Sequence, residues 1–131
     1  ASVIIIAVPF GILEYHILKP AALPIGSGAT SFIAASLILI MCTGYLEELV
    51  FRGLLQHNAT GLMSKWWGIF IVSTIFGVLH VGNLALLDCL LAFSIGFIYS
   101  MVREKTGSIY GISLSHGLIN IVLFLVAPVY F

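Results

Sequence analysis

Residues 37–56 read LILIMCTGYLEELVFRGLLQ, an apolar run in which two adjacent glutamates and an arginine are embedded. The run is part of a longer apolar segment that begins near Ala29 and ends at about Gln56. A helix rises about 1.5 Å per residue, so this segment would be ~40 Å long and exceed the ~30 Å hydrocarbon core of a bilayer. We therefore expect a membrane-spanning helix whose C-terminal part tilts or projects from the membrane.

The composition of the whole chain agrees with a membrane protein. Of its 131 residues, 61% are hydrophobic and 8% are charged, and five basic residues balance five acidic ones. A soluble domain carries about 25% charged residues and could not bury this much apolar surface. The apolar content also excludes a disordered chain, and the lack of a basic excess excludes a nucleic-acid-binding protein. The expected surroundings are a lipid bilayer, with no nucleic acid among the partners.

Four further apolar runs predict four more helices, since a spanning helix needs about 20 mostly apolar residues. These runs cover Ser2–Leu18, Trp66–Val81, Leu84–Met101 and Ser108–Leu125, and Pro128 is expected to disrupt the end of the last one. Residues 57–65 are expected to form a polar link. The predicted fold is all-α, a polytopic transmembrane bundle of about five helices in a single integral membrane domain over residues 1–131. Because the sequence opens on an apolar run without an initiator Met, we expect a truncated or processed piece of a longer protein.

The basic residues of the predicted links indicate an orientation. Lys65, Arg103 and Lys105 fall in links on one side of the bundle, whereas Lys19 falls on the other side. Cytoplasmic loops carry an excess of Lys and Arg, so the first side is expected to face the cytoplasm.

Four charged residues lie inside predicted helices rather than in links: Glu47, Glu48, Arg52 and Asp88. Each costs at least ~2.5 kcal/mol at the centre of a membrane helix unless it is paired or hydrated. Glu48 and Arg52 are four residues apart with the glutamate first, which favours an ion pair on one helix face. Glu47 has no such local cation, and Asp88 is expected to make a structural hydrogen bond between helices or to lie near the far interface. The alternative for the first three is a helix end at the headgroups, where water solvates them.

Further polar groups lie on apolar helices: His80 on the third, and His116 with Asn120 on one face of the fifth. A glutamate near a neutral histidine can take a proton from water and make that water a nucleophile. A second histidine and an asparagine can donate hydrogen bonds to the oxyanion of a tetrahedral intermediate. The set predicts hydrolysis of an amide bond without a covalent enzyme intermediate.

The same residues also suit a metal ion. Two histidines and one glutamate are a known zinc-binding set, here Glu47, His80 and His116. No HExxH motif occurs, and the ligands would come from three separate helices, so spacing alone does not separate the two chemistries. A serine nucleophile has less support, because Ser113 and Ser115 precede His116 without a GxSxG motif.

Three motifs follow one another on successive apolar segments. In chain order they are Glu47-Glu48-x-x-x-Arg52, Phe76-x-x-x-His80 and His116-x-x-x-Asn120. Together they resemble the CPBP family of intramembrane proteases, the CAAX proteases and bacteriocin-processing enzymes also called the Abi family, which includes the type II CAAX prenyl endopeptidases. The resemblance covers the motif core at residues 44–120.

The resemblance implies an all-α membrane fold whose active-site cavity lies within the membrane and opens toward the cytoplasm. It also implies that Glu47 and His80 activate water and that His116 and Asn120 form the oxyanion site. Glu48 and Arg52 would support the site structurally. Because the CAAX branch of the family looks metal-independent, the resemblance implies that no cofactor is needed, and zinc remains the alternative.

The predicted function is therefore that of an intramembrane endopeptidase. Its substrate would be a membrane-associated protein or peptide, for which a prenylated CAAX tail is one candidate. The alternative is a non-catalytic scaffold or immunity-type member of the same family, since buried polar groups can also specify packing.

Overall fold

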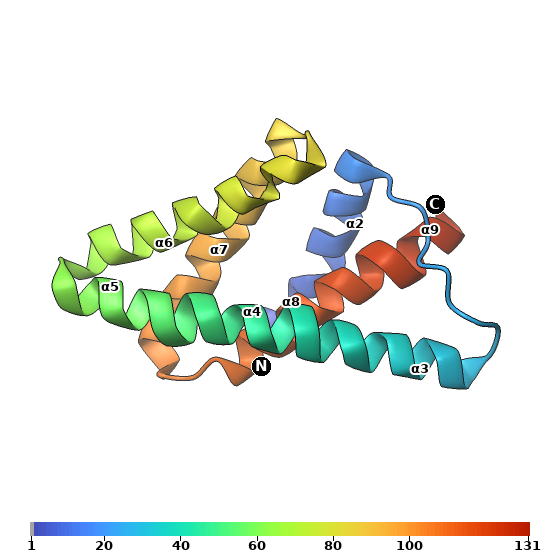
Figure 1. Cartoon of the computed structure of the whole chain (residues 1–131), viewed down its shortest axis with the longest axis horizontal. Coiled ribbons are helices and arrows are strands. Elements are labelled where there is room, and N and C mark those ends of the chain that lie inside the picture. The colour runs from blue at the N-terminus through green and yellow to red at the C-terminus, as the bar shows by residue number, and fades with distance from the viewer. Residues whose placement is uncertain (1) are drawn as a thin grey trace. The chain divides into compact units, whose positions relative to one another are not determined.

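The computed structural model describes residues 2–131, which are helical almost throughout and contain no strand (Figure 1). Consecutive elements join into five longer helical segments, which we call rods. The first rod consists of α1 (Ser2–Ile5) and α2 (Ala7–Leu18). The second consists of α3 (Ala29–Ile38), η1 (Leu39–Tyr45), α4 (Leu46–Glu48), η2 (Leu49–Leu55) and α5 (Gln56–Leu62). The remaining three are α6 (Lys65–Leu79) with η3 (His80–Asn83), then α7 (Leu86–Thr106), then α8 (Tyr110–Ile121) with η4 (Val122–Val126) and α9 (Ala127–Tyr130). The predicted all-α fold of about five helices is confirmed.

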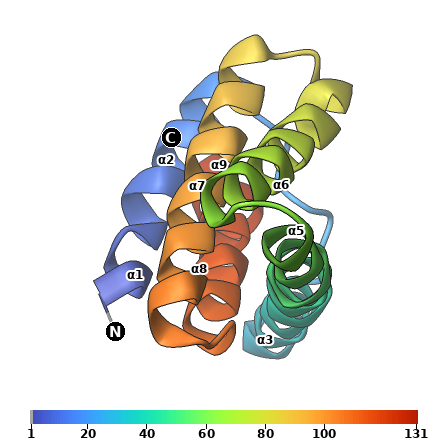
Figure 2. The same ribbon diagram turned by 90° about the vertical axis from the view of Figure 1, so that its left-hand side faces the viewer.

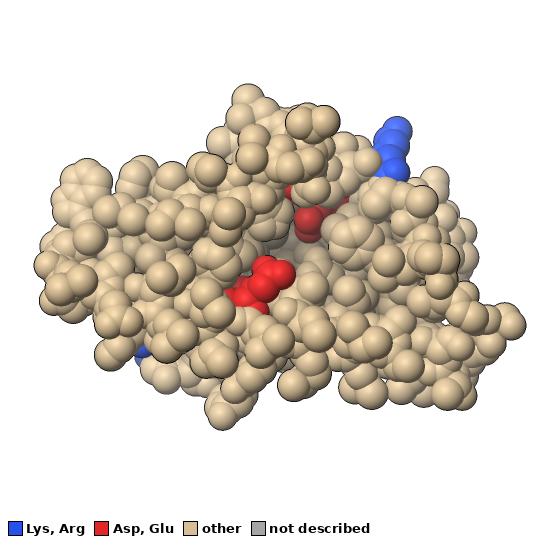
Figure 3. Space-filling view, viewed as in Figure 1, with Lys and Arg blue, Asp and Glu red and all other residues tan. Residues whose placement is uncertain are grey.

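Four of the five rods are long and apolar enough to cross a membrane. They are Ala29–Leu62, Lys65–Asn83, Leu86–Thr106 and Tyr110–Tyr130, and the helical region Val3–Leu18 is apolar but shorter. Many of their large apolar side chains point outward, such as Leu86, which is 75% exposed. The face drawn in Figure 3 carries few charged atoms. Such an apolar exterior is what a lipid-facing surface requires.

The described residues form two compact units. Unit 1 comprises residues 2–47 and 110–131, and unit 2 comprises residues 48–109. The boundary between the units lies inside the second rod, between Glu47 and Glu48. The expectation of a single domain over residues 1–131 stays a prediction.

In unit 1, α8 packs against η1 and α2. A Cβ atom added to Gly44 would lie 2.5 Å from the Ser113 carbonyl oxygen and 2.9 Å from the Gly117 backbone nitrogen. A Cβ atom added to Gly117 would lie 2.7 Å from the Cα atom of Ile40. Only hydrogen fits on both glycines, so η1 and α8 approach at backbone contact distance, as membrane helices with small residues do.

The C-terminal rod continues past Pro128, so the prediction that this proline disrupts the helix is wrong. A proline has no backbone N–H, which leaves the carbonyl four residues earlier without its helical donor. That carbonyl belongs to Phe124, and the backbone N–H of Leu23 donates a hydrogen bond to it at 3.1 Å. The π-helical turn η4 lies just before α9, and a neighbouring segment supplies the missing donor, so the helix tolerates the proline.

The second rod continues to Leu62, so the predicted polar link at residues 57–65 is also wrong. Polar side chains in this segment bond to carbonyls of their own helix instead of ending it. The Asn58 side chain donates to the Leu54 carbonyl at 2.8 Å, and the Thr60 hydroxyl donates to the Gln56 carbonyl at 2.9 Å. The break comes only at Met63, whose backbone is extended.

In unit 2, α6 and α7 lie side by side and are joined through η3 (Figure 2). Four buried side chains form the core between these helices and η2: Phe51, Val72, Phe76 and Ala92. The helix α7 ends at Thr106, later than predicted, where Gly107 adopts a left-handed conformation with φ 68°. Glycine takes this conformation without strain, which makes it the usual residue after a helix end.

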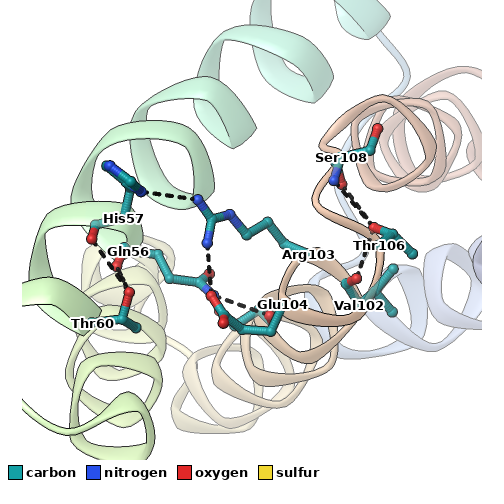
Figure 4. A network of polar contacts seen from close by, with 9 residues as sticks. Gln56, His57, Thr60, Val102, Arg103, Glu104, Thr106 and Ser108 are labelled. Atoms are coloured by element: carbon teal, nitrogen blue, oxygen red, sulfur yellow. Dashed lines mark hydrogen bonds and ion pairs between the residues drawn. The ribbon is translucent and has the colours of Figure 1, made fainter.

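A polar network joins α5 to the end of α7 in unit 2 (Figure 4). The buried side-chain amide of Gln56 donates to the Ser100 carbonyl at 3.1 Å and to the Glu104 carboxylate at 3.0 Å. Arg103 donates to the same carboxylate at 2.7 Å, and another of its nitrogens lies 3.4 Å from the His57 ring. Arg103 and Glu104, expected in a link, are therefore part of a helix–helix contact.

Candidate catalytic site

Glu47 and His116 lie together in unit 1. The Oε2 atom of Glu47 is 3.9 Å from the Nε2 atom of His116, which is ion-pair range and longer than a direct hydrogen bond. The glutamate side chain is 40% exposed, whereas the histidine side chain is 9% exposed. The structure thus brings together two of the four residues predicted to carry the chemistry.

The backbone contact at Gly44 and Gly117 accounts for this pairing. Gly117 directly follows His116 on α8, and Gly44 precedes Glu47 by three residues on the second rod. Because the two backbones touch at the glycines, the side chains of Glu47 and His116 have only a short distance to span between the helices. The short reach of a glutamate is then enough to approach the imidazole.

Two π-helical segments flank Glu47, η1 before it and η2 after it, with the three-residue α4 between them. A π-helix closes its hydrogen bonds between residues five apart instead of four, and such segments occur frequently at functional sites. The wider turn changes the angle between successive side chains. A regular α-helix, as expected from the sequence, therefore does not correctly predict which side chains of this segment share a helix face.

Asn120, four residues after His116 on α8, is bound to a residue that sequence reasoning missed. Its Nδ2 atom donates to the Thr43 hydroxyl at 2.7 Å, and that hydroxyl donates to the Leu39 carbonyl at 2.6 Å. Thr43 precedes Glu47 by four residues, and this spacing is the one signal in the sequence that could have indicated it. Asn120 is 9% exposed, so its amide lies in a largely buried position.

Glu48 and Arg52 form the ion pair that their spacing predicts, and this prediction is confirmed. The Nη1 atom of Arg52 lies 2.9 Å from the Oε1 atom of Glu48, and both side chains are 0% exposed. The pair lies in unit 2, where the guanidinium carbon is 4.4 Å from the centre of the Phe76 ring and 5.8 Å from the centres of the Phe51 and Tyr99 rings. Aromatic faces attract a cation, which offsets part of its lost hydration.

Gly96 provides the room for this guanidinium. A Cβ atom there would lie 2.9 Å from Arg52 Nη2 and 3.1 Å from Phe76 Cδ1. The glycine lies on α7, far from the Glu-Glu-x-x-x-Arg motif in sequence, so no local pattern indicated its role.

His80 lies in unit 2 at the end of α6, as the first residue of the 3₁₀ turn η3 rather than inside the helix as predicted. Its Nδ1 atom is 2.9 Å from the carbonyl oxygen of Phe76. A carbonyl only accepts, so Nδ1 must carry the hydrogen, and in the neutral ring Nε2 then carries the lone pair. The Phe76-x-x-x-His80 motif thus fixes both the orientation and the tautomer of its own histidine.

Asp88, the remaining charge in the apolar segments, makes a local hydrogen bond to a residue five positions earlier, whereas a hydrogen bond between helices or a place near the far interface was expected. The Asn83 side chain donates to Asp88 Oδ2 at 2.7 Å and so ties η3 to the first turn of α7. Asp88 is 1% exposed.

The residues of the zinc alternative are divided between the two units. Glu47 and His116 lie in unit 1 and His80 in unit 2. Within residues 2–131, no group of three or more His, Cys, Asp or Glu side chains could hold a metal ion. Whether these three side chains could bind one zinc ion depends on how the two units are placed relative to one another. The zinc alternative therefore stays a prediction.

Comparison with known proteins identifies one family. Residues 29–122 match the family model described as "Type II CAAX prenyl endopeptidase Rce1-like". The match covers well over half of the chain and includes all three motifs at residues 47–52, 76–80 and 116–120. Neither a curated protein nor a solved structure gives a significant match.

Proposed function

Because the chain belongs to the Rce1-like family of type II CAAX prenyl endopeptidases, we propose that it is an intramembrane endopeptidase. Its four long apolar helices, together with this membership, make it an integral membrane protein. The substrate would be a membrane-associated protein or peptide, with a prenylated CAAX tail as the first candidate. The observation that carries the proposal is the 3.9 Å approach of Glu47 and His116, with Asn120 on the next turn of the same helix.

In the proposed reaction, the Glu47 carboxylate takes a proton from a water molecule, and the resulting hydroxide attacks the carbonyl carbon of the scissile peptide. The carbonyl π electrons move to oxygen, which becomes an oxyanion. N–H groups of His116 and Asn120 donate hydrogen bonds to this oxyanion, because preorganised donors lower the barrier where negative charge develops. When the intermediate collapses, the C–N bond breaks and the proton held by Glu47 passes to the leaving amine.

The family motif assigns His80 as the second group that activates water, and we retain this role as a proposal. Its support here is local, since the Phe76 carbonyl holds the Nδ1 hydrogen and leaves Nε2 as the basic nitrogen. Glu48 and Arg52 are proposed to support the site without touching substrate. Both side chains are 0% exposed and bind each other.

The site is proposed to open toward the cytoplasm and to need no metal. The orientation rests on the basic residues of the links predicted from the sequence, where Lys65, Arg103 and Lys105 on one side outnumber Lys19 on the other. The Glu47 side chain is 40% exposed, and the proposed reaction requires water to reach this exposed part.

A cleavage assay with a farnesylated CAAX peptide tests the proposal on purified protein in lipid vesicles. Glu47→Gln keeps the size of the side chain but removes its ability to take a proton, so cleavage should fall by at least ~100-fold. Glu47→Asp is the matched variant, because it keeps a carboxylate and should retain measurable cleavage. The proposal is overturned if Glu47→Gln unfolds at the wild-type temperature and cleaves as fast as wild type.

A further inference from the structure

The side-chain amide of Asn120 is held by a hydroxyl from another helix, that of Thr43. We propose that Thr43 is a positioning residue that fixes which end of the Asn120 amide faces the reacting carbonyl. This inference rests on the proposed function, because it concerns how the oxyanion donor is oriented. It does not place Thr43 in contact with substrate.

The hydrogen of the Thr43 hydroxyl can be located from two distances. Its Oγ1 atom lies 2.6 Å from the Leu39 carbonyl oxygen, and two oxygens this close repel each other unless a hydrogen lies between them. The carbonyl has no hydrogen, so the single hydrogen of the threonine must point at Leu39. Toward Asn120, at 2.7 Å, the hydroxyl can therefore only accept.

The amide of Asn120 must then present its NH2 group to Thr43 and not its carbonyl oxygen. One N–H points to the threonine, and the second N–H points away from it in the plane of the amide. Asn120 makes no other side-chain hydrogen bond to the part of the chain that the structure describes. The second N–H is thus the donor that remains for an oxyanion.

Loss of the Thr43 hydroxyl would release this constraint. The terminal torsion of asparagine is broad and roughly two-fold, so an untethered amide can turn its oxygen to where the NH2 group was. A carbonyl oxygen facing a developing oxyanion would repel it. Thr43 would then affect the rate of the chemical step while leaving substrate binding nearly unchanged.

The chain offers a matched control for the local part of this arrangement. Thr74 on α6 donates to the Phe70 carbonyl at 2.8 Å, the same four-residue back-bond that Thr43 makes to Leu39. In the described residues Thr74 accepts no hydrogen bond from another helix. Replacing each threonine by valine therefore removes the same back-bond, but only Thr43→Val removes the contact to Asn120.

The first test compares Thr43→Val, Thr43→Ser and Thr74→Val in the farnesylated-peptide cleavage assay. We expect Thr43→Val to lower kcat by ~10- to 100-fold and to change KM by less than ~2-fold. Complete removal of an oxyanion donor lowers kcat by ~100- to 1,000-fold, and a misplaced donor should cost less. Thr43→Ser keeps the hydroxyl and should restore kcat to within ~3-fold, and Thr74→Val should match wild type. Adding Thr43→Val to Asn120→Ala should cause no further loss, because both act through one group.

The second test does not depend on cleavage. The chain has three asparagines, at positions 58, 83 and 120, so [¹⁵N]asparagine labelling gives three pairs of side-chain amide proton signals, and Asn120→Ala identifies the relevant pair. In wild type, one Asn120 amide proton should exchange with solvent more slowly than the other, and Thr43→Val should abolish this difference. Thr74→Val should leave it intact.

The outcomes separate this inference from the proposed function. If Glu47→Gln abolishes cleavage but Thr43→Val retains the wild-type kcat, the proposed function stands and the role of Thr43 is overturned. Unchanged exchange of the Asn120 protons in Thr43→Val overturns the role of Thr43 as well, whatever the substrate. If Glu47→Gln cleaves normally while the amide signal responds as expected, the proposed function is overturned, and only the hydrogen bond between Asn120 and Thr43 is supported.

Discussion

The guanidinium carbon of Arg52 lies 4.4 Å from the centre of the Phe76 ring. The first of these residues belongs to the Glu-Glu-x-x-x-Arg motif and the second to the Phe-x-x-x-His motif, so the contact joins two motifs within unit 2. The same arginine binds the Glu48 carboxylate at 2.9 Å, and the Phe76 carbonyl holds the His80 ring at 2.9 Å. Phe76 thus connects the buried ion pair, through its ring, to the histidine whose tautomer its carbonyl fixes.

Removal of Arg52 alone should be far more damaging than removal of the whole pair. Arg52→Met leaves the Glu48 carboxylate buried without its cation, which costs about 3–5 kcal/mol of folding free energy. In the double variant Glu48→Leu with Arg52→Met, both charges of the pair are removed, so neither is left buried without its partner, and much of that stability should return. Reversible unfolding in mixed detergent measures both free energies.

Arg103 provides the matched control for this prediction. It pairs with Glu104 at 2.7 Å, but the two side chains are 20% and 16% exposed. A partly hydrated pair contributes about 1 kcal/mol or less, so Arg103→Met should change stability little. Equal losses for Arg52→Met and for the Glu48–Arg52 double variant would show that the buried pair itself stabilises the fold.

Gly96→Ala should destabilise unit 2 because the new methyl group would meet the guanidinium of Arg52 and the ring of Phe76 at 2.9 and 3.1 Å. Overpacking of this kind costs about 1–3 kcal/mol. Gly61→Ala on α5 is the control, since nothing lies within 4 Å of its added Cβ atom. Its stability should equal or slightly exceed that of wild type, because alanine restricts the unfolded chain. A Gly96→Ala protein as stable as the Gly61→Ala protein would contradict the steric role of Gly96.

These contacts show which parts of the fold the sequence predicts. Apolar runs predict the helical rods, because lipid requires every backbone group to be satisfied within a helix. The four-residue spacing of Glu48 and Arg52 predicts their ion pair, because both lie on one helix and no tertiary information is needed. Helix ends are predicted less well, since Asn58 and Thr60 bond to their own helix where polarity suggests a link.

The candidate site is less predictable, because its geometry depends on contacts between helices. The approach of Glu47 to His116 requires the backbone contact at Gly44 and Gly117, which no single segment reveals. The π-helical segments on either side of Glu47 also change the direction of its side chain relative to a regular helix. The four-residue spacing of Thr43 from Glu47 does not show that its hydroxyl meets Asn120, because that contact joins two helices.

Asp88→Asn should separate structural from catalytic carboxylates. Asp88 binds the Asn83 side chain at 2.7 Å and is 1% exposed, so the substitution weakens a buried hydrogen bond at the start of α7. Loss of a charged partner costs about 1–3 kcal/mol of stability. The folded protein should nevertheless cleave the farnesylated peptide with a kcat near that of wild type, unlike Glu47→Gln. Loss of kcat in a fully folded Asp88→Asn protein would assign this carboxylate a place in the reaction.

Chelation should leave the proposed hydrolysis unchanged, because Glu47 activates water without a metal in that mechanism. Protein incubated with EDTA or 1,10-phenanthroline and then freed of chelator should retain its kcat, and elemental analysis should find less than ~0.1 zinc per chain, well below the full occupancy of a structural or catalytic site. The zinc alternative gives the opposite result, since removing a catalytic ion removes the Lewis acid that generates hydroxide. Activity lost on chelation and restored by added zinc would therefore replace the metal-free mechanism. His116→Ala distinguishes the two further, because it should abolish zinc binding in one case and lower only the rate of oxyanion formation in the other.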